Sequence, residues 1–375
     1  MKLRNLLIGT FATIALCVTF TSCTKNDDTP NDSNSKIELP SKRAYILYEG
    51  PSGYNKSGIA FYAPNKDADF QNDIFELQNN KKLGALANSF IEYKNHIYVV
   101  VSESKYISKL NEACVEVATY KIPEGEGYPR NIIAYDGYLY VTQYGGKVTE
   151  IDANTMRPTE EYFSGGNNLE GITECNGNLY VANAYKIESN GEYNNYIYLT
   201  EIFEINPKDM TLKSPLKVVE NPECLMEIDD KVYLISRGDY GSVKNTLQVI
   251  DPETKEVKNL VEASKMAEGI NNQLLLINSN TTYDANWNAT ISNTFFTYNT
   301  KTGEIKNESF IKNAPEELFK SNIYLLAVDD ETGEIYVGTS DYVNTGTIYR
   351  FSEDGTLKET FDAGGVNPNK MLFID

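Results

Sequence analysis

The chain has 375 residues, with 34 Lys plus Arg against 53 Asp plus Glu, and a formal net charge of −19. Such an acidic chain argues against a nucleic-acid binder, because each phosphate contact needs a cation. The apolar content of 41% is enough for a large core and excludes disorder across the whole chain. The sequence has a single histidine, His96, which argues against a Ser-His-Asp triad or an HExxH zinc helix.

The first 22 residues are predicted to be a signal peptide. Lys2 and Arg4 precede an apolar run over residues 6–20, which is too short to span a bilayer comfortably. The run ends in Phe-Thr-Ser-Cys at residues 20–23, which resembles the bacterial lipobox, with two small residues before the cysteine. Cys23 is therefore the predicted lipidation site. An ordinary signal peptide with an incidental cysteine is the alternative.

Residues 23–43 are predicted to be the lipidated cysteine and a flexible polar tether, because this stretch lacks apolar periodicity. Two or more acyl chains would hold the mature protein on a membrane. Lys25 followed by Asp27 and Asp28 is similar to the surface-export signal of Bacteroidetes lipoproteins. That resemblance implies a lipid-anchored outer-membrane protein that faces the cell exterior, whereas a merely solvated linker is the alternative.

A short apolar strand recurs seven times after residue 43. Its copies are 45–47, 98–100, 140–142, 180–182, 233–235, 275–277 and 336–338. Their first residues are 53, 42, 40, 53, 42 and 61 positions apart, and a mean of about 48 fits a four-stranded propeller blade. Asp136-Gly137 and Asn176-Gly177 precede two copies and supply the positive φ angles of hairpin turns.

The two ends of the repeat region are complementary. The first blade has strands at 45–48 and 59–62 and an expected outer strand near 73–77, but no preceding inner strand. Residues 369–374 look like an orphan inner strand. The sequence therefore predicts an all-β, seven-bladed β-propeller of four-stranded blades over residues 44–375, closed when the C-terminal strand joins the N-terminal blade. A stack of two β-sandwiches is the alternative.

Two segments carry a family resemblance. LYVTQYGGKVTEID at 139–152 and LYVANAY at 179–185 resemble the YVTN repeats of YncE-like propellers in bacterial surface proteins. Lipidated Bacteroidetes members of this kind often accompany outer-membrane TonB-dependent transporters, and some resemble lipoproteins that capture cobalamin. The resemblance thus implies a partner transporter and a transported small molecule, with cobalamin as one candidate.

The predicted ligand site is a ring of aromatic residues. In a propeller the connections after the second strand and before the first strand of each blade emerge on one face. Every blade has an aromatic residue just after its second strand, and together they offer flat contact area for a large ligand. These residues are Tyr54, Tyr106, Tyr144, Tyr185, Tyr240, Tyr283, Trp287 and Tyr342.

Polar residues are expected on the same face. Amide side chains can pair with ligand carboxamides, and arginines can bind phosphate or form inter-blade salt bridges. The predicted binding residues among them are Arg130, Gln143, Asn168, Asn183 and Arg237, accompanied by Glu49, Asn167, Glu170, Asp239 and Asp341.

The leading hypothesis is a non-catalytic, surface-tethered capture protein without a cofactor or a bound metal. A glycan-binding or adhesive propeller is one alternative, because glycans also stack on Tyr and Trp. A metal-dependent lactonase is another, although no acidic ligand cluster stands out in the sequence. Cys114, Cys175 and Cys224 are odd in number, lack CxxC spacing, and are expected to be small buried apolar residues.

Overall fold

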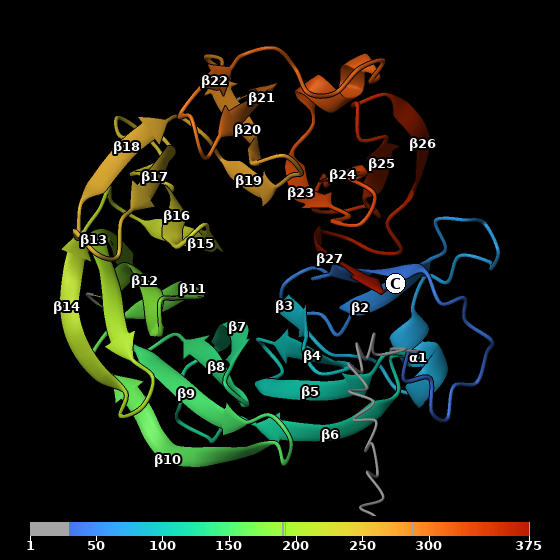
Figure 1. Ribbon diagram of the computed structural model, residues 1–375, viewed down its shortest axis with the longest axis horizontal. Helices are drawn as coiled ribbons and strands as arrows, with labels where there is room; N and C mark the ends of the chain where they lie inside the picture. Colours follow the sequence, from blue (N-terminus) through green and yellow to red (C-terminus); the bar gives the residue numbers. More distant parts are fainter. Residues whose placement is uncertain (1–29, 190, 192, 287, 375) are drawn as a thin grey trace, which may run out of the picture.

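The computed structural model describes residues 30–189, 191, 193–286 and 288–374. Within these ranges the chain forms seven antiparallel sheets, six with four strands and one with three, arranged in a ring around a central axis (Figure 1). The predicted seven-bladed β-propeller is confirmed. The predicted signal peptide and Cys23 lie outside the described residues.

We number the blades I to VII in chain order and letter their strands a to d from the axis outward. Blade I contains β27 (Pro368–Ile374), β1 (Arg43–Tyr48) and β2 (Gly58–Tyr62). Blade II contains β3 (Ala87–Glu92), β4 (His96–Val101), β5 (Tyr106–Asn111) and β6 (Glu116–Lys121). Blade III contains β7 (Pro129–Tyr135), β8 (Tyr138–Gln143), β9 (Lys147–Asp152) and β10 (Arg157–Ser164).

The remaining blades repeat this order. Blade IV contains β11 (Asn168–Cys175), β12 (Asn178–Ser189), β13 (Asn194–Asn206) and β14 (Thr211–Lys217). Blade V contains β15 (Pro222–Ile228), β16 (Lys231–Ser236), β17 (Thr246–Ile250) and β18 (Val257–Val261). Blade VI contains β19 (Lys265–Glu268), β20 (Gln273–Tyr283), β21 (Ala289–Asn299) and β22 (Ile305–Lys306). Blade VII contains β23 (Ile323–Val328), β24 (Ile335–Thr339), β25 (Thr347–Phe351) and β26 (Leu357–Asp362), and a short 3-10 helix, η1 (Glu316–Lys320), precedes it.

The two ends of the propeller meet in blade I, as predicted. Strand β27 pairs antiparallel with β1, with Met371 opposite Ile46. The seam between blades VII and I is also held by Arg350, which donates to the Tyr62 hydroxyl at 2.8 Å and to Glu359 Oε1 at 2.8 Å. Closure removes the open sheet edges that a linear array of blades would leave.

The outer strand expected near 73–77 is instead a helix, α1 (Ile74–Asn79). Asp73 caps it, since its Oδ1 accepts a hydrogen bond from the Glu76 amide at 2.9 Å. Ile74 and Phe75 are fully buried in the cluster of apolar side chains between blades I and II. The cap and this packing favour a helical turn over an exposed edge strand, so the prediction of a fourth strand in this blade was wrong.

The N-terminal segment is bound to the propeller. Arg43 is fully buried, and its Nη2 lies 2.5 Å from Asp32 Oδ1 and donates to the Glu112 carbonyl at 3.0 Å. The Lys36 amide donates to Gln78 Oε1 at 2.8 Å. Residues 30–43 thus contact the propeller at several points, and residues 23–29 of the predicted tether lie outside the described ranges.

The two faces of the disc differ in the connections that they carry. We call the face with the b–c and d–a connections the loop face, and the face with the a–b and c–d connections the turn face. Glu112 lies between β5 and β6 in a c–d connection, and its backbone amide donates to the Asn31 carbonyl at 3.1 Å. The chain therefore enters the propeller on the turn face.

The core consists of apolar clusters between blades. Tyr233 and Ile235 of blade V, for example, pack against Leu274 and Leu276 of blade VI. The three described cysteines are free, with Cys114 and Cys175 buried as predicted and Cys224 partly exposed. No helix in the described ranges has the length and apolar character needed to cross a bilayer.

Candidate ligand-binding face

The inner strands carry β-bulges at the same level of the propeller. In the part of the chain that the structure describes, the pairing of strands a and b shifts register in every blade except VI. A bulge leaves one residue outside the ladder and re-aims its side chain. Together with Lys265 of blade VI, the polar residues at these positions form what we call the axial ring: Asn88, Arg130, Glu170, Glu223, Lys265, Tyr324 and Asn369.

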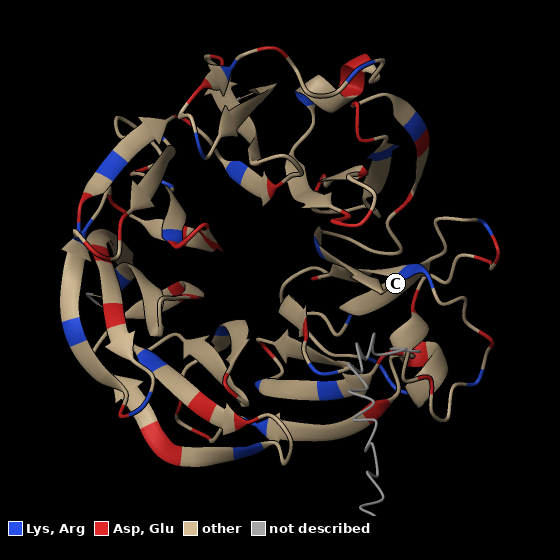
Figure 2. Cartoon of the chain, in the orientation of Figure 1, with Lys and Arg blue, Asp and Glu red and all other residues tan. Residues whose placement is uncertain are grey.

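The axial ring links neighbouring blades through hydrogen bonds. The Tyr324 hydroxyl of blade VII donates to Glu49 Oε2 of blade I at 2.6 Å. Asn369 Nδ2 donates to Glu49 Oε1 at 3.0 Å and to the Ala87 carbonyl of blade II at 3.0 Å. Lys265 Nζ donates to the Tyr324 carbonyl at 2.7 Å. Figure 2 shows charged residues of both signs on the strands nearest the axis.

Two arginines predicted for the site form ion pairs within this region. Arg130 Nε lies 3.0 Å from Glu170 Oε2, and Arg237 binds Glu223 while its Nη1 donates to the Ser264 carbonyl at 3.0 Å. Burial raises the pKa of Glu170, although Arg130 opposes this shift. Burial would also raise the pKa of Glu223, but Arg237 outweighs it and lowers that pKa to about 2. Arg130 therefore forms a salt bridge between blades III and IV, whereas Arg237 forms its salt bridge within blade V and reaches blade VI through the Ser264 carbonyl.

Lys265 is a cation in a confined environment. Burial, together with the positive charge of Arg237, lowers its pKa to about 8. The carboxylates of Glu223 and Glu49 oppose this shift at longer range. Because these groups sit on different blades and yet influence one ammonium, the charges converge toward the axis.

Five tyrosines form a row on the loop face, which we call the tyrosine ladder: Tyr144, Tyr185, Tyr196, Tyr198 and Tyr240. The ring centroids of Tyr144 and Tyr185 are 5.9 Å apart, and those of Tyr185 and Tyr196 are 5.7 Å apart. Tyr198 contacts Tyr240 of blade V at 5.6 Å. Tyr196 and Tyr240 are 51% and 71% exposed, so the ladder presents aromatic surface to solvent.

A long hairpin in blade IV places the centre of the ladder. Strands β12 and β13 continue past the other strands of their sheet, and Tyr185 lies directly opposite Tyr198 in the pairing register. Residues opposite each other, and residues two apart along one strand, share a face of the sheet. Tyr185, Tyr196 and Tyr198 therefore project from one face of the hairpin.

The ladder adjoins the axial ring at Tyr144. Its hydroxyl donates to Glu170 Oε1 at 2.6 Å, and the Arg130 guanidinium lies 4.9 Å from the centre of its ring. Tyr144 begins a three-residue loop that ends in Gly146, at φ 81°. A Cβ on Gly146 would lie 2.0 Å from the Gly166 carbonyl oxygen, so glycine lets this loop pack against the next connection.

The structure brings together part of the predicted site. Tyr144, Tyr185 and Tyr240 belong to the ladder, and Arg130 and Arg237 border it. Asn168 begins β11 opposite Tyr185 in the register. On the other side of the axis, Tyr342 contacts Tyr324 of the axial ring at 5.9 Å between ring centroids.

Other predicted residues lie elsewhere. Tyr106 packs between blades I and II, and its hydroxyl donates to the Leu83 carbonyl. Gln143 and Asn183 are buried within their blades, where Asn183 Oδ1 accepts from the Asn167 amide at 2.9 Å. Tyr54 and Tyr283 are each 60% exposed in their own connections, and Trp287 lies outside the described residues.

The sequence analysis missed several residues of this region. Tyr196 and Tyr198 were placed outside a strand, because the third strand of blade IV was expected to begin near residue 201 rather than at Asn194. The alternation in Tyr196-Ile197-Tyr198 was the available signal. No such signal marked the other residues near the axis. Bulges decide where the side chains of Asn88, Glu223, Tyr324 and Asn369 point, whereas Lys265 and Lys370 are regular ladder residues that only the closed ring brings to the axis.

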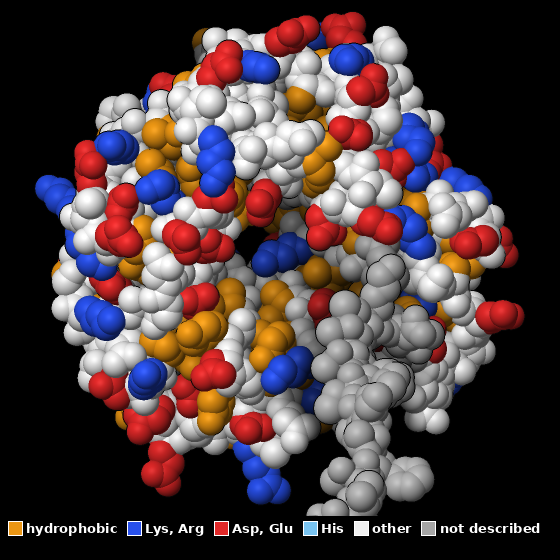
Figure 3. Space-filling view, in the orientation of Figure 1, with side chains coloured by type: hydrophobic (Ala, Val, Ile, Leu, Met, Phe, Trp, Pro, Cys, Tyr) orange, Lys and Arg blue, Asp and Glu red, His pale blue; other side chains and the backbone are white. Residues whose placement is uncertain are grey.

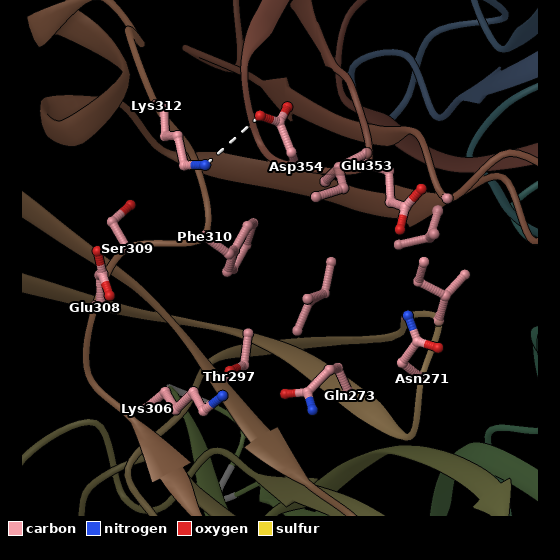
Figure 4. Close-up of a pocket in the computed structure, with 16 residues that line it drawn as sticks. Asn271, Gln273, Thr297, Lys306, Glu308, Ser309, Phe310, Lys312, Glu353 and Asp354 are labelled. Atoms are coloured by element: carbon pink, nitrogen blue, oxygen red, sulfur yellow. Dashed lines mark ion pairs between the residues drawn. The ribbon is translucent and has the colours of Figure 1, made fainter.

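A separate cavity of about 480 Å³ lies between blades VI and VII at the turn face (Figure 4). Strand β22 has only two residues, so it covers little of the blade edge here. Leu275, Phe310 and Ile335 provide apolar walls, and Lys312 Nζ lies 3.6 Å from Asp354 Oδ2 at the rim. This cavity was not predicted, and it is on the opposite face from the tyrosine ladder.

In the described residues, no group of three or more His, Cys, Asp or Glu side chains is arranged to hold a metal ion. His96 begins β4 next to an a–b turn, and its Nδ1 lies 2.8 Å from the Lys94 carbonyl. It therefore lies on the turn face, away from the tyrosine ladder.

Comparisons with known proteins identify the fold. No family model and no curated protein matches the chain. Among solved structures, the chain is similar to the computationally designed Ika8 protein, with a TM-score of 0.53, 10% identity, and coverage of 86% of this chain and 89% of that chain. U3-55K matches with a TM-score of 0.51, 10% identity, and coverage of 74% and 81%.

BamB from Moraxella catarrhalis matches with a TM-score of 0.47, 10% identity, and coverage of 90% of this chain and 88% of that chain. At 10% identity, the likeness to Ika8 and U3-55K concerns the fold alone. The chain is thus a β-propeller, and its function has to be argued from its own residues.

Proposed function

We propose that the protein is a non-catalytic capture protein, anchored through a lipid on Cys23 to the outer membrane and facing the cell exterior. It binds a large ligand on the loop face and delivers this ligand to an outer-membrane TonB-dependent transporter. Cobalamin is the first candidate ligand. The protein itself needs no cofactor for this role.

The tyrosine ladder is the observation that carries the proposal. Its five rings run from blade III to blade V, and two of them are more than half exposed. Tyrosine offers a flat apolar body together with a polar hydroxyl, which suits a ligand that has both kinds of surface. The exposed aromatic surface of Tyr196 and Tyr240 is more than packing of the blades requires.

Cobalamin matches this surface in its chemistry. Its broad corrin ring would lie against the ladder, and its rim of amides would find polar partners among the side chains that border the axis. Its near-neutral total charge avoids repulsion from a protein of net charge −19. A highly anionic cargo would not have this advantage.

The attachment of the N-terminal segment supports the same arrangement. The chain reaches the propeller on the turn face, where the Glu112 amide binds the Asn31 carbonyl. Residues 24–30 can span at most about 25 Å when fully extended. An anchor at Cys23 would therefore hold the turn face near the membrane and leave the loop face free for a ligand.

The test is a calorimetric titration of the purified protein with cyanocobalamin. We expect binding at micromolar or tighter affinity, and Tyr196→Ala should weaken it about tenfold because it removes one stacking ring. Tyr162→Ala is the matched control, since Tyr162 is 55% exposed on the outer strand β10 and lies away from the ladder. Its affinity should equal that of the wild type.

Two results would count against cobalamin capture. Absence of heat at high cyanocobalamin concentration would exclude this ligand, and heat on titrating oligosaccharides would then favour the glycan-binding alternative. Equal weakening by Tyr196→Ala and Tyr162→Ala would show that the ladder is not the binding surface.

A further inference from the structure

One ammonium near the axis stands outside the ion pairs that link the other charged side chains there. The opposite charges neutralise each other within two ion pairs, Arg130 with Glu170 and Arg237 with Glu223. Glu49 accepts hydrogen bonds from Tyr324 and Asn369, and its charge acts on Lys265. Lys370, on the inner strand β27, donates to no carboxylate of this network.

Lys370 is held only by neutral groups. Its Nζ donates to Ser89 Oγ of blade II at 2.8 Å and to Asn131 Oδ1 of blade III at 3.4 Å. Among the described residues, no carboxylate lies within 4.0 Å of this ammonium. A confined charge without a counter-ion is costly, so the site favours a negatively charged occupant.

The side chain of Lys370 extends toward the centre of the ring. It starts on β27 of blade I, and yet its charge acts on Cys224 of blade V, as do the charges of Lys265 and Arg237. The charges of three cations from different blades therefore act on this one side chain. Burial accordingly lowers the pKa of Lys370.

Two neighbouring amide oxygens also lack partners. Asn88 Oδ1 and Asn369 Oδ1 are buried and have no hydrogen-bond donor among the described residues. Buried acceptors are normally satisfied by protein or by ordered water. Water molecules that hydrate a bound ion would supply these donors. Figure 3 shows that the molecule is open at the axis, with acidic and basic side chains around the opening.

We propose that the axial channel contains an anion-binding site centred on Lys370, which accepts a small monoanion such as a halide or a carboxylate group. One negative charge neutralises the Lys370 ammonium, which donates a charge-assisted hydrogen bond to it. The site is independent of the ligand proposed for the tyrosine ladder, because it is built from the inner strands.

Bromide is the probe for a crystallographic test, because its anomalous scattering identifies its position. In crystals of the wild-type protein soaked in sodium bromide, we expect an anomalous peak within hydrogen-bonding distance of Lys370 Nζ. The peak should be missing from Lys370→Met crystals. A wild-type map without a peak at Lys370 would overturn the proposal, even if the variant failed to fold.

Chloride binding in solution provides the second measurement, through the broadening of the ³⁵Cl resonance. Lys370→Met should weaken chloride binding about tenfold or more, because a hydrogen bond to a charged group is lost. Lys208→Met removes an exposed lysine of blade IV and should leave the broadening unchanged. Equal broadening by wild type and Lys370→Met would contradict the site. Neither measurement involves cyanocobalamin, so failure of one proposal leaves the other intact.

Discussion

The turn face and the loop face follow different rules. On the turn face, three a–b connections are two-residue turns in which both residues have positive φ: Asp136-Gly137, Asn176-Gly177 and Asp229-Asp230. On the loop face, the connections range from three residues at 144–146 to the long segment 307–322 that contains η1. One face is thus a uniform scaffold, and the other is free to specialise.

Closure of the ring is the feature on which both faces depend. Deleting residues 368–374 removes β27 and leaves β1 without its inner partner. We expect loss of cooperative unfolding, and hence of most of the roughly 5–15 kcal/mol that stabilises a domain. Circular dichroism during heating measures this loss, and deletion of Asp375 alone is the control. A truncated protein with the midpoint of the wild type would contradict closure.

A change confined to the turn face should affect stability alone. Gly137 has φ 91°, and a Cβ there would meet no atom within 4 Å, so Gly137→Val introduces backbone strain without a clash. We expect it to lower the free energy of unfolding by about 1–3 kcal/mol. Chemical denaturation measures that change, with Gly137→Asn as a milder control. If Gly137→Val also weakened the affinity for a loop-face ligand, this result would contradict the expectation that a change on the turn face affects stability alone.

The smallest effect concerns the axial ring, between the two faces. The pKa of Glu223 is lowered from 4.5 to about 2, so its ionised form is favoured in the folded protein. Its contribution to stability is present above about pH 4.5 and is lost as the pH falls toward 2. The pKa of Glu170 is shifted upward, so its contribution has the opposite sign.

Unfolding midpoints of wild type and Glu223→Gln between pH 2 and 6 check this prediction. The difference between the two proteins should shrink as the pH falls, whereas the difference between wild type and Glu170→Gln should not shrink in that way. A pH-independent difference for Glu223→Gln would show that Arg237 does not stabilise the carboxylate.

Local sequence signals predicted the architecture because each one acts over a few residues. The recurring strands are short, continuous apolar runs of the kind that are buried on both faces. Asp-Gly or Asn-Gly has the φ angles that a two-residue turn needs. The orphan strand at 369–374 then required a partner, and β1 was the strand that lacked one. The same local reasoning failed at α1, where the Asp73 cap and the burial of Ile74 and Phe75 stabilise a helix instead of a strand.

The candidate site was less predictable because it depends on contacts between distant segments. Tyr144, Tyr185 and Tyr240 could be named from their places after a strand. The positions of their neighbours Tyr196 and Tyr198 depend on the long hairpin of β12 and β13. The strand pattern in the sequence did not indicate the length of this hairpin.

The sequence by itself determined the number of blades, the turns that join their strands and the identity of the two ends that close the ring. Only the tertiary structure decided which polar side chains meet at the axis, because the bulges of six blades re-aim residues of their inner strands and the curvature of the ring then brings seven strands together. Lys370 is an example of such long-range contacts. Its hydrogen-bond partners Ser89 and Asn131 belong to blades II and III and are more than two hundred residues away in the chain.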